Sequence, residues 1–199
     1  MKQATFTIVG IAPYSQSRVL QTKRTELQDG QEFEEATWRE HIHKDENQRV
    51  FIPPMAMKNC LAETAKFISM SVPGKGKSTY TKHFEAGILC TEPINLEVQD
   101  GKGWVPLLKD AVKSERLFLP SDGRRGSGKR VWKIYPLVPP PWRGEVKMTV
   151  IDNTITADVF ETHLARAGQY VGIGRFRPRN NGFYGRFGFT DLHFEEMDE

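Results

Sequence analysis

This sequence contains no run of about 18 apolar residues, the length that a helix needs to span a membrane. Cysteine is also scarce: Cys60 and Cys90 are the only two, and both lie in apolar surroundings. This usage suits buried thiols in a reducing compartment better than a disulfide framework. The first residues carry one lysine before a short apolar run, which favours a first strand over a signal peptide. We therefore expect a cytoplasmic protein without membrane contact.

Patterns typical of metal and cofactor sites are missing as well. No CxxC motif and no paired Cys/His spacing indicates zinc. Asp152, Asp158 and Glu161 are spaced as a turn and as first-turn helix acids, which interact favourably with the helix dipole. Residues 74–78 (GKGKS) lack the earlier glycine and the preceding strand of a P-loop, and 172–174 (GIG) lack the third glycine of a dinucleotide fingerprint. The sequence predicts no cofactor and no metal ion.

Charge is distributed unevenly, although the net charge is only +3. Eight acids lie between positions 26 and 46, and five more lie in the tail from 191 to 199. The bases gather in three glycine-containing segments, 74–82, 123–133 and 171–187. Such segregation produces a positive surface region and favours a polyanionic partner.

The segment 171–187 (VGIGRFRPRNNGFYGRF) is the most informative part of the chain. Glycine lets a backbone approach a ligand closely, arginine presents a planar fork to phosphate, and aromatic rings stack on bases. We expect the arginines to neutralise phosphates, the aromatics to stack on bases and the glycines to allow close approach. The expected phosphate contacts are Arg175, Arg177, Arg179 and Arg186. The expected stacking rings are Phe176, Phe183 and Tyr184. The glycines expected to allow close approach are Gly172, Gly174 and Gly182.

Bases elsewhere are expected to extend this track. Lys75 and Lys77 lie in a flexible basic loop that suits phosphate contact. The segment 121–133 carries five bases beside Trp132, and its glycines and serine favour ordering on binding. The expected contacts outside 171–187 are Lys58, Lys75, Lys77, Arg124, Arg125, Lys129 and Arg130.

Hydrophobic periodicity predicts the secondary structure. Pro53 and Pro54 suit a first helical turn, after which apolar residues recur at spacings of three and four until Pro73-Gly74. A second helix is expected over 156–168. Strands are expected over 3–12, 84–98, 144–151, 170–173 and 183–194. A short helical turn is expected at 38–43 (WREHIH), within a polar stretch that covers about 15–50.

This order of elements indicates an α+β protein. It matches the ferredoxin-like (RNA-recognition-motif-like) βαββαβ core, an antiparallel sheet with two helices on one face. The polar stretches at about 15–50 and 100–143 are then long insertions. We expect one domain over residues 1–199.

Three blocks of the sequence resemble the RAMP superfamily of CRISPR effector proteins. The glycine pattern GxGR followed by GxYGRF, at 172–187, resembles that family's C-terminal glycine-rich loop. Residues 51–67 resemble the entry to its first helix, where a basic residue, here Lys58, faces RNA. The first strand with 10–17 fits in order. The resemblance implies guide-RNA binding, by a repeating backbone subunit or by a processing ribonuclease.

The leading hypothesis is a non-catalytic protein that binds single-stranded nucleic acid, RNA favoured over DNA. It is expected to form a homo-oligomer along the strand or to join a multi-subunit ribonucleoprotein, with the acidic segment 26–46 docking on a neighbour's basic surface. Three alternatives stay open. They are a single-stranded DNA-binding protein of a phage or mobile element, a protein-binding mimic of a CRISPR subunit, and a metal-independent ribonuclease. The last would use His41 or His43, placed on one face of a strand, with Lys44 as the cation.

Overall fold

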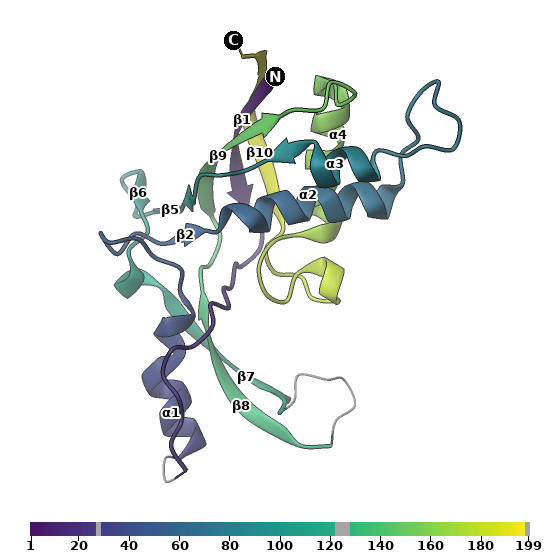
Figure 1. Ribbon diagram of the computed structural model, residues 1–199. Helices are drawn as coiled ribbons and strands as arrows, with labels where there is room; N and C mark the ends of the chain where they lie inside the picture. The colour runs from purple at the N-terminus through teal and green to yellow at the C-terminus, as the bar shows by residue number, and fades with distance from the viewer. Residues whose placement is uncertain (27–28, 122–127, 198–199) are drawn as a thin grey trace.

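The computed structural model describes residues 1–26, 29–121 and 128–197. Its main sheet is antiparallel with the order β10-β1-β9-β5-β6, and β3 also pairs with β9 (Figure 1). The protein is therefore α+β, as the sequence predicts. The strands of this sheet are β1 (Lys2–Gly10), β3 (Ile88–Leu89), β5 (Glu97–Gln99), β6 (Trp104–Pro106), β9 (Trp142–Val150) and β10 (Phe187–Glu196).

One face of the sheet packs against the helices α2 (Pro54–Ile68), α3 (Thr81–Ala86) and α4 (Ala157–Arg166). Burial alternates along β1, so Ala4, Phe6 and Ile8 point into this core. The ring of Phe6 meets that of Phe160 on α4 at 5.9 Å, and Phe160 also stacks with Phe84 on α3. The alternation predicted for the first strand is confirmed.

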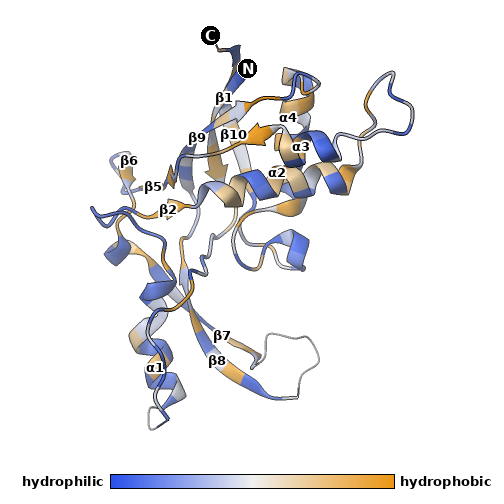
Figure 2. Ribbon diagram, viewed as in Figure 1, coloured by the Kyte–Doolittle hydropathy of each residue, from blue (hydrophilic) through white to orange (hydrophobic). Residues whose placement is uncertain are grey.

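Helix α2 begins as predicted, with Pro53 as its N-cap and Pro54 in the first turn. Figure 2 shows the alternation of apolar and polar residues along it, and its apolar side is buried. The predicted end at Pro73-Gly74 was wrong. The helix stops at Ile68 because Ser69 takes a left-handed conformation, with φ of 47°.

Helix α4 is also confirmed, capped by Thr156, whose hydroxyl accepts a bond from the amide of Val159. The strand predicted over 170–173 was wrong, because α4 runs on into a π-helical turn, η3 (Ala167–Val171). Gly168 allows this turn to pack closely against the start of β10, since a Cβ would lie 1.9 Å from the carbonyl oxygen of Phe187. The last strand starts at Phe187 rather than at 183.

The strand expected over 84–98, interrupted at Pro93, was wrong at its start and in its continuity. Phe84 lies on α3, and the chain then forms β3, β4 (Ile94–Asn95) and β5 as separate short strands. A buried Phe84 satisfies a helix and a strand equally well, so its apolar character did not distinguish them. β4 pairs with β2 (Phe51–Ile52), beside the start of α2.

The two long polar stretches contain secondary structure of their own. The first holds α1 (Gly30–Thr37) and the 3-10 turn η1 (Trp38–His41), which confirms a helical turn at 38–43. The second holds η2 (Lys109–Ala111) and a hairpin of β7 (Lys113–Pro120) and β8 (Arg130–Leu137), which extends away from the sheet (Figure 1). Glu34 on α1 pairs with Lys133 of β8, so at least one acid of segment 26–46 is used within the chain.

Among the described residues, no helix is both long and apolar enough to cross a membrane.

Candidate nucleic-acid interface

The glycine-rich loop, residues 172–186, connects η3 to β10 and is held closed by its own backbone. The amide of Ile173 donates to the carbonyl of Gly185 at 3.0 Å, and that of Tyr184 donates to Phe176 at 3.0 Å. Gly172, Gly174 and Gly185 all have positive φ. Phe176 also has positive φ, 56°, which is a strained conformation for a bulky residue. The loop therefore has a defined conformation, with backbone strain at Phe176.

The segment after β1, residues 10–17, runs alongside this loop and bonds to both of its arms. The amide of Arg175 donates to the carbonyl of Ser15 at 2.9 Å, and the amide of Gly185 donates to that of Pro13 at 2.7 Å. Gln16 reaches the other way: its Nε2 donates to the carbonyl of Phe51 at 2.7 Å. This segment therefore joins the loop to the entry of α2.

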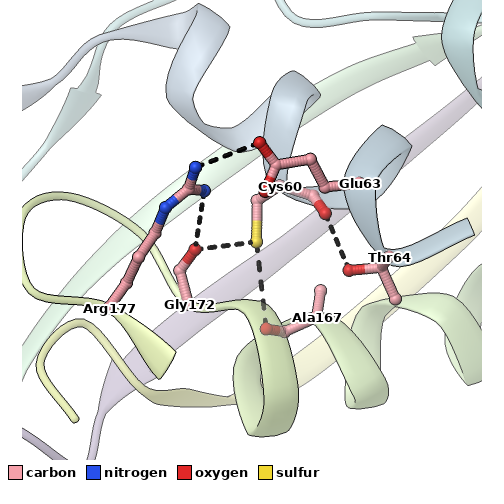
Figure 3. Close-up of polar contacts among 6 residues, drawn as sticks. All are labelled: Cys60, Glu63, Thr64, Ala167, Gly172 and Arg177. Carbon is pink, nitrogen blue, oxygen red and sulfur yellow. Dashed lines mark hydrogen bonds and ion pairs between the residues drawn. The ribbon is translucent and has the colours of Figure 1, made fainter. Parts of the chain in front are cut away.

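A second set of contacts fixes the loop directly to α2 (Figure 3). The Arg177 guanidinium donates to Glu63 at 3.0 Å and to the carbonyl of Gly172 at 3.4 Å. The Cys60 thiol also donates to Gly172, at 3.3 Å. Burial raises the pKa of this thiol to about 12, so it remains a donor at neutral pH. Arg177, expected to neutralise a phosphate, is instead engaged within the fold.

The loop, the segment 10–17 and the start of α2 enclose a cleft of about 280 Å³. Its walls are mostly polar and uncharged, except for His43 and the Glu63–Arg177 pair. In the described parts of the chain, the side chains of Ser17, Asn59 and Asn180 make no hydrogen bond. The lining residues are Tyr14, Gln16, Ser17, His43, Pro53, Ala56, Asn59, Glu63, Gly174, Arg177 and Asn180.

Within the loop, the tip carries two exposed residues that were predicted to bind. Arg179 is exposed, and Phe183 has 60% of its surface exposed while resting edge-on against Tyr184. Arg175 and Arg186 are partly buried, and the Nε atom of each has no hydrogen-bond partner among the described residues. The guanidinium of Arg175 lies 4.2 Å from the ring of Tyr135.

Tyr184 occupies a different position from the one expected for a stacking ring. It is buried, with only 7% of its surface exposed, and its hydroxyl donates to the Glu115 carboxylate of β7. Burial and this carboxylate raise the pKa of the phenol. Its ring contacts Phe176 and Phe183, so it supports the loop from beneath and joins it to the hairpin.

The remaining predicted contacts are spread over three elements. Lys58 lines a groove on the exposed side of α2. Lys75 and Lys77 are exposed on the loop between α2 and α3, and Lys129 and Arg130 are exposed on the hairpin. Two further predicted contacts, Arg124 and Arg125, lie outside the described residues.

The histidine pair is arranged differently from the expectation. Because η1 ends at His41, the two residues do not share the face of a strand. Nδ1 of His41 lies 2.7 Å from the carbonyl oxygen of Arg18, and its ring contacts Tyr135. His43 instead lines the cleft, where burial and, secondarily, the charge of Arg18 lower its pKa.

The two central strands of the sheet, β1 and β9, offer no aromatic side chain on its open face; Trp104 of the edge strand β6 lies on this face, with its ring 4.5 Å from the Arg143 guanidinium. RNA-recognition motifs stack bases on aromatic residues of this face. The outward residues of β1 and β9 include no aromatic; they are Gln3, Thr5, Thr7, Val9, Arg143, Glu145, Lys147 and Thr149. A larger pocket on this side, about 490 Å³, is lined by acids as well as bases. The described residues also contain no group of three metal-ligating side chains.

Sequence reasoning missed the polar residues of the cleft. Asn59 and Glu63 are four positions apart on α2, so a helical projection places them on one side of the predicted helix. Gln16, Ser17 and Asn180 lie in irregular segments, where no periodicity reports which way a side chain points.

No family model and no curated protein matches this sequence. Among solved structures, it is similar to a chain in the cryo-EM structure of the Type III-B Cmr-beta bound to cognate target RNA. The TM-score is 0.51 with 11% sequence identity, over 98% of this chain and 61% of that one. At this identity the likeness concerns the fold, and this protein spans less than two thirds of the length of the other chain.

Proposed function

We propose that this protein binds single-stranded nucleic acid, RNA in preference to DNA, in the cleft beside the glycine-rich loop, without cleaving it. The observation that carries the proposal is the meeting of three separate segments around one cleft. Segment 10–17, the start of α2 and the loop 172–186 are far apart in sequence, yet hydrogen bonds and shared walls join them. These are the three blocks in which the sequence resembles RAMP proteins.

We also propose that the chain forms one domain with a ferredoxin-like, RAMP-like core. The polar stretches at about 15–50 and 100–143 are insertions into this core. Taking β1, β3 with β5, β9 and β10 as the four core strands, the sheet order is fourth, first, third, second. Helix α2 follows the first of these strands and α4 follows the third. The likeness to the Cmr-beta chain supports this assignment.

In the proposed mode of binding, exposed cations hold phosphates while the fold positions the backbone. Arg179 and Lys58 pair with phosphates, and Phe183 stacks on a base. At the start of α2, Pro53 and Pro54 have no amide hydrogen and the amide of Ala56 donates to Pro53, so the amide of Met55 is the first that can favour an anion near the cleft. Arg177 and Tyr184 act as supports that hold the loop in its binding shape.

RNA is preferred because of the uncharged polar groups in the cleft. Ser17, Asn59 and Asn180 offer hydroxyl and amide groups that suit hydrogen bonds to a 2′-hydroxyl, the group that distinguishes RNA from DNA. The chain with the similar fold belongs to an RNA-bound assembly, which supports the same choice.

The same comparison supports a place within a ribonucleoprotein, and we propose a homo-oligomer along the strand on the basis of surface charge alone. Glu32 and Glu35 are exposed on α1, while Lys129 and Arg130 are exposed on the hairpin. A contact between these surfaces on successive copies would be heterologous and would build an open array.

Equilibrium binding to a labelled RNA of about 30 nucleotides tests the proposal. We expect affinity to fall at least about tenfold between roughly 50 and 200 mM salt, because phosphate contacts release counterions. DNA of the same sequence is the matched ligand and should bind more weakly. Absence of binding, or affinity independent of salt, would leave a protein-binding module as the better description.

A ribonuclease is the second candidate, because His43 lines the cleft. Its lowered pKa favours the neutral imidazole, which is the form that accepts a proton from a 2′-hydroxyl. The cleft supplies no second histidine within the described residues, and its arginine is paired with Glu63. The described lining of the cleft therefore supplies neither a second imidazole nor an unpaired cation.

We accordingly expect RNA incubated with the protein in EDTA to stay intact over hours. His43→Ala should leave this result unchanged and alter affinity less than about fivefold, the effect of losing one hydrogen bond. Gel analysis of the RNA provides the measurement. Cleavage that disappears in His43→Ala would establish the enzyme instead.

A further inference from the structure

Two aromatic side chains are exposed beyond the cleft. Phe67, in the last turn of α2, has 58% of its surface exposed, and Tyr170, in η3, has 42%. Their ring centroids lie 5.8 Å apart, and the guanidinium of Arg166 lies 5.8 Å from the ring of Tyr170. An exposed aromatic pair with a neighbouring cation is a suitable stacking surface for nucleic-acid bases.

The exposed side of α2 connects this aromatic pair to the cleft. Asn59, Glu63 and Phe67 are spaced by four residues and form one ridge of the helix. Lys58, Ala62 and Lys66 form the next ridge. A groove runs beside both ridges, and it shares Asn59 and Glu63 with the cleft. From Asn59 to Phe67 the helix rises about 12 Å, the length of roughly four stacked nucleotides.

The charges along this path favour a polyanion. Lys58 and Lys66 line the groove, and Arg166 stands beside the aromatic pair. The groove also contains two acids. The charge of Glu63 is offset by its ion pair with Arg177, which leaves Glu85 on α3 beside the two lysines.

We propose that Phe67 and Tyr170 form a second base-stacking subsite, reached by a strand that leaves the cleft along the exposed side of α2. This inference rests on the proposed function, because it assigns a further contact to the same nucleic acid. A short strand fills the cleft, whereas a longer strand also reaches the aromatic pair.

The test compares RNAs of roughly 5 and 15 nucleotides on the wild type and on Phe67→Ala/Tyr170→Ala. We expect the variant to bind the short RNA like the wild type and the long RNA roughly tenfold more weakly. Phe67→Tyr/Tyr170→Phe keeps both rings and should retain wild-type affinity for each RNA. Leu89→Ala/Ile151→Ala removes two side chains of 42% and 43% exposure that line neither the cleft nor the groove, and should change neither affinity.

The outcomes separate this subsite from the function on which it rests. If the alanine pair binds the long RNA as tightly as the wild type, the subsite is refuted while the cleft stands. An equal loss with Leu89→Ala/Ile151→Ala also refutes it, because the effect would then be unspecific. If the wild type binds neither RNA, the proposed function fails and the subsite fails with it.

Discussion

Replacing Gly185 by alanine is expected to lower the free energy of unfolding by about 3–5 kcal/mol. Gly185 has φ of 63°, and a Cβ there would lie 1.8 Å from the carbonyl oxygen of Ile173. That oxygen belongs to backbone, so the loop has to open to accommodate the methyl group. The same residue donates to Pro13 and accepts from Ile173, so its displacement also disturbs the wall of the cleft.

Thermal and denaturant unfolding measure this effect. At about 3 °C per kcal/mol for a chain of this size, the melting temperature should fall by roughly 10 °C. Gly188→Ala is the matched control three positions along, because nothing lies within 4 Å of its added Cβ and its φ is not positive. A melting temperature for Gly185→Ala equal to that of Gly188→Ala would contradict the backbone geometry described here.

Reversing the charges of Lys58 and Arg179 should weaken RNA binding at least about a hundredfold. Each substitution removes a proposed phosphate contact and places a carboxylate near the phosphate, and juxtaposed like charges cost several kcal/mol. Neither side chain forms an ion pair among the described residues, and Arg179 is exposed, so the fold should persist. Arg177 is a poorer choice for this test because it clamps the loop to α2.

The salt dependence adds a second measure. Loss of two contacts should reduce the slope of log affinity against log salt by about 1.4, at roughly 0.7 per single-strand phosphate. Lys102→Glu/Lys113→Glu gives the same change in net charge at exposed positions outside the glycine-rich loop, outside α2 and outside the lining of the cleft. Comparable loss in both double variants would mean that bulk charge, rather than this site, governs binding.

The sequence predicted the elements whose two sides differ most in polarity. β1, α2, β9 and α4 each bury one side against a common core, and period two or period 3.6 reports that burial directly. α1 and the β7–β8 hairpin were missed because few of their residues enter that core; Ile134 of β8 is one that does. α1 is only eight residues long and buries Phe33 with the polar residues Glu34 and Thr37, so few apolar residues mark its period, and β7 has no fully buried residue.

The sequence identified the segment of the candidate site from its composition. It did not show which residues of this segment are exposed and which are engaged within the fold. The glycine-rich segment was identified because glycine, arginine and aromatics were concentrated there. Arg177 and Arg179 are indistinguishable in sequence, yet one is an internal clamp and the other is exposed. Phe183 and Tyr184 differ in the same way.

The sequence by itself therefore determined that the chain is α+β, where its core elements lie and which segment concentrates glycine, arginine and aromatic residues. These properties depend on local periodicity and composition, which a linear chain displays. Only the tertiary structure decided that segment 10–17, the start of α2 and the glycine-rich loop form one cleft. The contacts that join the glycine-rich loop to the other two segments, such as Arg177 with Glu63, connect residues over a hundred positions apart. Such pairings arise when the chain packs into its tertiary structure, and the sequence around one residue does not identify the residue that it contacts.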